Sequence, residues 1–338
     1  MVTGKELILA TKPYAKEIRW KSWVYTLSTL FLLVLSLSST LYFHNVFLKL
    51  FFSVFSGLLM VRMFVIYHDY LHHSILYKSL PARVLFSVFG VFILAPASIW
   101  KRSHDHHHNH NSKLFSASIG SYPIMTSDKF MKASEKERLG YLAIRHPLTI
   151  ALGYFSMFLY GICIQSFTKS FVRHWDSLLA FVLHVSVAIF LLTKVSLLGW
   201  LMMWFLPFFI ADMIGSYLFY AQHNFPAVQF KNNVEWNYFD AALKSSSYMV
   251  MNPFWRWITA NIGYHHIHHI NSRIPFYRLP EVMDQIPQLQ HASRTSLRFS
   301  EIIACLRLKV WDENLNRMIS LSELESKRTQ PVVGTAQS

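Results

Sequence analysis

Histidines gather in three short segments of the sequence. These are "HDYLHH" at residues 68–73, "HDHHHNH" at residues 104–110 and "HHIHH" at residues 265–269. In the first segment, His68 and His72 are four residues apart, so one face of a helix presents both side chains. Imidazole nitrogen is a ligand for iron, zinc, copper and nickel. The three segments together therefore predict a metal site.

The second and third segments repeat one spacing, with histidines at positions i, i+3 and i+4 on a single helix face. The histidines with this spacing are His104, His107 and His108 in the second segment, and His265, His268 and His269 in the third. His106 points away from that face. His223 in "LFYAQHNFP" is a further candidate, at the point where a long apolar run ends before Pro226.

Eight or nine imidazoles exceed the coordination sphere of one ion, so the count predicts two metals. A catalytic zinc site usually keeps three protein ligands and one open position. Histidine in this number, with few carboxylates nearby, favours iron that reacts with oxygen. Two cysteines, Cys163 and Cys305, provide neither a disulfide framework nor a thiolate site.

The rest of the chain has the composition of an integral membrane protein. Of its 338 residues, 53% are hydrophobic and only 15% are charged, against roughly 25% charged in soluble domains. The apolar runs 24–43 and 46–67 are each long enough to span a bilayer and predict a helical hairpin. The net charge of +14 is explained by loops that face an anionic membrane surface, and no nucleic-acid partner is expected.

The basic segment 12–21 predicts a cytoplasmic N-terminus, which places His68 at the cytoplasmic end of the second span. Basic residues flank the apolar stretch 84–99 on both sides, so we expect it to be interfacial or re-entrant. If all the histidine segments lie on one side, an even number of crossings separates them. One of three later apolar runs is then not a full span, and the sequence leaves open which of 148–168, 177–193 and 195–221 it is.

The predicted fold is thus all-α and integral to the membrane, with about four transmembrane helices, interfacial or re-entrant helices, and a cytoplasmic helical cap that carries the histidine segments. We expect a single domain over residues 1–315 and a loose polar tail over 316–338. Asp212 interrupts an apolar run, and an ionisable residue in such a position is a candidate for function. It either lines a channel for the substrate or reaches the lipid headgroups.

The three histidine segments resemble the histidine boxes of the membrane fatty acid desaturases. "SIWKRSHDHHHNHNSK" and "HHIHHINSRIPFYRLPE" are similar to stretches of bacterial acyl-chain desaturases, and the resemblance covers roughly residues 60–290. It implies a nonheme diiron centre that uses O2 to introduce a cis double bond into a fatty acyl lipid or thioester. The ligands that it implies are His68, His72, His104, His107, His108, His223, His265, His268 and His269.

Several alternatives stay open at this stage. His73, His106, His110 and His266 are possible substitutes within the boxes, and Asp69 and Asp105 either orient a neighbouring imidazole or are solvated charges. A fatty acid or alkane hydroxylase is the alternative enzyme, and a metal-handling membrane protein is a non-enzymatic one. The sequence contains no cytochrome b5 signature and no dinucleotide fingerprint, so we expect electrons from a separate ferredoxin or cytochrome b5-type protein.

Overall fold

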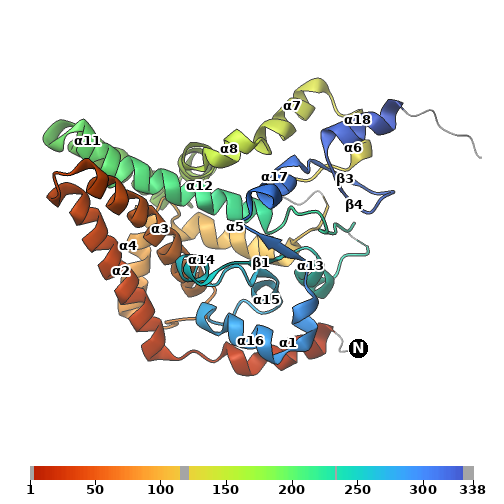
Figure 1. The fold of residues 1–338 in the computed structure, drawn as a ribbon, viewed down its shortest axis with the longest axis horizontal. Coiled ribbons are helices and arrows are strands. Elements are labelled where there is room, and N and C mark those ends of the chain that lie inside the picture. The colour runs from red at the N-terminus through yellow and green to blue at the C-terminus, as the bar shows by residue number, and fades with distance from the viewer. Residues whose placement is uncertain (1–3, 115–121, 233, 330–338) are drawn as a thin grey trace, which may run out of the picture.

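The computed structural model describes residues 4–114, 122–232 and 234–329. Helices dominate these residues, and their only strands form two sheets of two strands each. The long helices lie together at one side of the molecule, and shorter helices and the two small sheets lie at the other (Figure 1). The predicted all-α fold is confirmed.

Among the described residues, four helical segments are long and apolar enough to cross a membrane, as predicted. The first two, α2 (Arg19–Tyr42) and α3 (Val46–Leu71), form the expected hairpin, and the side chain of Asn45 caps α3 by accepting hydrogen bonds from its first backbone N–H groups. The third contains α10 (Trp175–Phe190), which continues into the π-helical turn η3 (Leu191–Val195). The fourth runs through α11 (Leu197–Trp200), η4 (Leu201–Phe205) and α12 (Leu206–Ala221).

The apolar run 148–168 is the one absent from these four. It is divided among α8 (Pro147–Ala151), the π-helix η2 (Tyr154–Ile164) and α9 (Gln165–Lys169). All three runs are apolar, so apolarity alone could not distinguish a broken helical segment from a continuous span.

The segment predicted to be interfacial or re-entrant is a bent pair of helices. α4 (Leu80–Phe92) and α5 (Ala97–His110) meet at 90°. Leu94 adopts a positive φ of 59° at the bend, and Pro96 is the N-cap of α5. The hydroxyl of Tyr67 on α3 donates a hydrogen bond of 3.0 Å to the Ala95 carbonyl, which fixes the bend against the second span.

The cap is built from short helices and one pair of parallel strands that connects distant parts of the chain. β1 (Tyr248–Val250) pairs with β2 (Arg294–Ser296), so that Tyr248 lies opposite Arg294. The helices of the cap are α1 (Gly4–Thr11), α6 (Ser127–Lys132), α7 (Glu135–Ile144), α13 (Tyr238–Lys244), α14 (Pro253–Ile258), α15 (His265–Ile270), α16 (Leu279–Gln285) and α17 (Phe299–Arg307).

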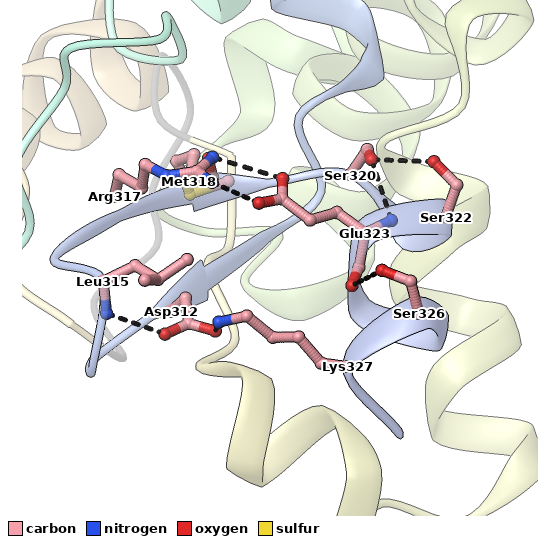
Figure 2. Close-up of polar contacts among 9 residues, drawn as sticks. All are labelled: Asp312, Leu315, Arg317, Met318, Ser320, Ser322, Glu323, Ser326 and Lys327. Atoms are coloured by element: carbon pink, nitrogen blue, oxygen red, sulfur yellow. Dashed lines mark hydrogen bonds and ion pairs between the residues drawn. The ribbon is translucent and has the colours of Figure 1, made fainter. Parts of the chain in front are cut away.

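The C-terminal segment packs against α6 and α7 of the cap. β3 (Val310–Asp312) and β4 (Arg317–Ile319) pair antiparallel, and α18 (Leu321–Thr329) follows. Figure 2 shows Lys327 of α18 directed at Asp312, where the ion pair measures 2.6 Å, and Arg317 paired with Glu323. The segment predicted as a loose tail, residues 316–338, therefore contains β4 and α18. Residues 330–338 lie outside the described residues.

Close packing between α3 and α12 sets the distance between two of the histidine-bearing helix ends. A Cβ atom placed on Gly57 of α3 would lie 2.8 Å from the backbone oxygen of Pro207 and 2.9 Å from the side chain of Ile210 on α12. Glycine therefore allows the two spans to approach at this level, as small residues commonly do between membrane helices.

We predict that Gly57→Ala lowers the stability of the detergent-solubilised protein by about 1–3 kcal/mol, because the added methyl group overpacks this contact. Gly140→Ala is the matched control, since no atom lies within 4 Å of a Cβ built at this position in α7. Gly140→Ala should raise the stability of the protein by about 0.4–1 kcal/mol. Thermal unfolding followed by tryptophan fluorescence measures both, and equal melting temperatures would refute the packing argument.

Candidate metal centre

All nine histidines predicted to be ligands are buried, and they converge in two neighbouring groups. Within each group, one potential ligand atom from every member lies within 4.8 Å of those of all the others. Group one consists of His68, His72, His104, His108 and His268. Group two consists of His107, His223, His265 and His269.

In group one, the Nε2 atoms of four imidazoles form a continuous series of close contacts. His68 lies 2.7 Å from His104, His104 lies 3.1 Å from His108, and His108 lies 3.1 Å from His268. The ring of His72 is 4.6 Å from that of His68, centroid to centroid. Three separate segments of the chain thus direct their imidazoles at one point.

Group two is built in the same way around His223. The Nε2 atom of His223 lies 3.0 Å from that of His107 and 2.8 Å from that of His265, which in turn is 3.1 Å from that of His269. The Nδ1–H of His223 donates to the carbonyl of Ser245 at 2.9 Å. This bond leaves the Nε2 lone pair directed into the group, which is how a second hydrogen bond commonly orients a metal-binding histidine.

The two groups share the helices that carry the second and third histidine segments. α5 contributes His104 and His108, four residues apart, to group one and His107 to group two. α15 contributes His265 and His269 to group two and His268 to group one. The end of α3 completes group one, and His223, just beyond α12, completes group two.

The geometry and the donor chemistry of both groups fit metal binding. Metal–imidazole bonds of about 2.0–2.1 Å place neighbouring nitrogens about 3 Å apart when the bonds are at right angles, and the Nε2 pairs lie 2.7–3.1 Å apart. The buried Nε2 of His72 has no hydrogen-bond partner among the described residues. Burial also lowers the pKa of His265, His268 and His269, and that of His223 to about 4. These imidazoles are therefore neutral, as metal ligands must be.

The four histidines considered as substitutes lie outside both groups. His73 has a positive φ of 59° and packs against Tyr77. His106 is exposed and stacks on His110, with ring centroids 4.1 Å apart. His266 is buried but turned away, since its Nε2 donates to the Leu289 carbonyl at 3.1 Å.

The two aspartates beside the boxes have different environments. Asp69 is buried, with Oδ1 3.4 Å from Nδ1 of His68 and Oδ2 accepting a hydrogen bond of 2.7 Å from the backbone N–H of Phe276. Asp69 therefore connects the first box to the chain that follows the third. Asp105 instead pairs with Lys101 at the surface, where both side chains are more than one third exposed. Each aspartate directly follows the first histidine of its box. The sequence therefore could not predict which of the two is buried.

A narrow apolar cavity of about 40 Å³ leads from the histidines into the membrane-spanning helices. His68, His104 and His265 line it, so it borders both groups, and the remaining wall comes mainly from α3 and α12. Asp212 also lines this cavity, and its Oδ2 is buried without a hydrogen-bond partner among the described residues. Asp212 precedes His223 by eleven residues of mostly helical chain, so it lies about 16 Å along the span from that histidine.

Comparison with known proteins agrees with this arrangement. The family model for fatty acid desaturases matches residues 43–300. The chain belongs to the fatty acid desaturase family. It is 28% identical over 282 residues to a fatty acid desaturase of Bacillus subtilis, with 82% of this chain and 79% of that protein covered.

Two further relatives are less similar to this chain in sequence. An omega-6 fatty acid desaturase of spinach chloroplasts is 25% identical, over 66% of this chain and 50% of that protein. An sn-1 oleoyl-lipid 12-desaturase of Synechocystis is 23% identical, over 67% of this chain and 64% of that protein. The protein is accordingly a membrane-bound desaturase, an oxidoreductase, and the non-enzymatic metal-handling alternative is wrong.

We predict that His223→Ala lowers the metal content of this desaturase, because group two then keeps only three imidazoles. Removal of groups that merely support ligands commonly costs about 10–100-fold in affinity or activity, so loss of a ligand should cost at least that. His106→Ala is the control, since His106 is exposed on the same cap. Elemental analysis of both purified variants measures the effect. Full metal content in His223→Ala would exclude His223 as a ligand.

Proposed function

We propose that this desaturase uses O2 to introduce a cis double bond into a fatty acyl chain at a histidine-ligated diiron centre. The observation that carries the proposal is the position of the two histidine groups, which lie side by side where a narrow apolar cavity ends. A long unbranched chain is the ligand that such a cavity fits. Family membership and the names of the relatives support the same reaction class.

Group one would hold one iron ion, and group two would hold the other. Nine imidazoles without a carboxylate among them form a set of neutral nitrogen donors that suits iron. When bound, the pair of ions would supply the chemistry that activates O2 and oxidises the chain. Histidines 73, 106, 110 and 266 have no part in this assignment, because they lie outside both groups.

The residues of the chain then have three tasks. The hydrogen bond from His223 to Ser245 and the contact between Asp69 and His68 orient the two imidazoles. Apolar side chains such as Met60 and Phe64 line the cavity, hold the acyl chain and exclude water from it. Because the walls leave little free volume, a methylene pair of the chain can be fixed beside His68 and His265 in one position, which a regioselective reaction requires.

We further propose a multi-pass topology in which the N-terminus and all three histidine boxes are cytoplasmic. The basic segment 12–21 before α2 supports this orientation. Four crossings return α3 and α12 to the same side, where their C-terminal ends lead into His72 and His223. The basic cytoplasmic face would attract an acidic ferredoxin or cytochrome b5-type protein as electron donor.

Hydroxylation is the second candidate, because the same metal centre would serve it, and sub-ångström placement of the chain decides between the two outcomes. No feature of the site favours hydroxylation, whereas the named relatives are desaturases. Desaturation is therefore the reaction that we assign.

Cells that express the protein together with a suitable electron donor should gain acyl chains with one additional cis double bond. Gas chromatography with mass spectrometry of the derivatised fatty acids gives its amount and position. His268→Ala should abolish the product because it removes a group-one ligand, and His106→Ala should retain it. Exclusive recovery of hydroxylated chains would assign the protein to the hydroxylases instead.

A further inference from the structure

An apolar groove of about 360 Å³ lies on the flank of α12, outside the narrow catalytic cavity. Its walls come from four helices that are distant in sequence, α8, α12, α14 and α17, all of which lie in the central part of the molecule (Figure 1). The side chains that line it are almost entirely apolar, among them Ile150, Ile214 and Ile302. It is large enough to hold part of an aliphatic chain, and the assignments made so far give it no role.

The groove and the catalytic cavity share one lining residue. Leu218 of α12 lines both of them. Leu218 stands five residues before His223, so this contact lies close to the metal groups.

At its other end the groove adjoins a polar cavity of about 640 Å³. Trp255 and Leu297 line both spaces. Arg294 and Arg298 line the polar cavity, both are exposed, and neither forms an ion pair within the described part of the chain. Glu301 is the one carboxylate in the wall, so positive charge predominates there. The β1–β2 pairing holds Arg294 in place.

Aromatic side chains surround this region on the outside. Phe254 and Trp257 of α14 are 51% and 40% exposed, and Phe299 at the start of α17 is 78% exposed. Aromatic side chains concentrate at the boundary between lipid and water. The guanidinium of Arg62 on α3 donates to the Trp257 carbonyl and lies 4.4 Å from the ring centroid of that residue, which fixes α14 to a membrane span. α14, which lines the groove, thus carries exposed aromatic side chains and is held against a membrane span.

We propose that the groove is a lateral binding site for an anionic glycerophospholipid, whose phosphate lies between Arg294 and Arg298 and whose acyl chain passes along α12 and past Leu218 to the metal groups. The order of cationic cavity, aromatic rim and apolar groove is the order of phosphate, glycerol backbone and acyl chain in a lipid that stands in one leaflet. A soluble acyl thioester would need no contact with an aromatic rim in the bilayer. The inference rests on the proposed function in one respect: it takes the acyl chain bound in the groove to be the acyl chain that is oxidised.

Photolabelling tests the groove without turnover, so hydroxylase chemistry or an unloaded metal site would not change the result. The probe is phosphatidylglycerol with a diazirine on its acyl chain, added to the full-length protein in phosphatidylcholine nanodiscs. Labels mapped by mass spectrometry should fall on residues 213–218 and 297–306. Ala151→Trp, which fills the groove from α8, should remove most of this labelling. Leu148→Trp is the control, because the side chain of Leu148 on the same helix is 58% exposed. This variant should leave the labelling unchanged.

The double variant Arg294→Gln/Arg298→Gln tests the phosphate subsite. It should reduce labelling by phosphatidylglycerol about 30-fold, because each arginine near an anionic lipid surface contributes a factor of about five. Arg307→Gln, at the exposed end of α17 and outside the cavity, should have no effect. Unlabelled phosphatidylglycerol should compete with the probe, and acyl-coenzyme A should not.

Three results would overturn the proposal. One is labelling that Ala151→Trp and Leu148→Trp affect equally, because the groove would then not hold the chain. Another is equal labelling of the double arginine variant and Arg307→Gln. The third is competition by acyl-coenzyme A as strong as that by phosphatidylglycerol, which would assign the site to a soluble thioester.

Discussion

Nine imidazoles lie within a few ångströms of one another in the interior of this protein, and the fold must hold them there. Burial favours the neutral form, which is also the form that can bind a metal. No single segment can supply the set, since one helix turn presents at most two or three side chains to a point. The chain therefore brings together the ends of two membrane spans, the helix α5 and the short cap helix α15. The close contact at Gly57 and the β1–β2 pairing in the cap are consequences of that demand.

The sequence predicted which histidines would meet, because helical spacing alone places i, i+3 and i+4 side chains on one face. It did not predict how they divide. His104 and His107 share a face of α5 but belong to different groups, and this division depends on where α3 and α15 approach α5. His223 carried the least support of the nine, since no box surrounds it. Its place in group two depends on α12 and on the carbonyl of Ser245, which is distant in sequence from the boxes.

Other features could not be read from the sequence for the same reason. Asp69 and Asp105 occupy equivalent motif positions, yet only Asp69 is buried against its neighbouring histidine, because the backbone of Phe276 reaches it from beyond the third box. The count of about four spans followed from parity, but the sequence did not show which of the three apolar runs is not a span. A turn at Leu152, between α8 and the π-helix η2, interrupts the run 148–168, and composition does not predict it.

Anomalous X-ray diffraction at the iron absorption edge, from crystals of the iron-loaded protein, tests whether the histidines divide into two metal-binding groups. We expect two separate anomalous peaks in each chain if this division is correct. One should be bound by His68, His72, His104, His108 and His268, and the other by His107, His223, His265 and His269. A single peak, or one that His104 and His107 ligate together, would contradict it.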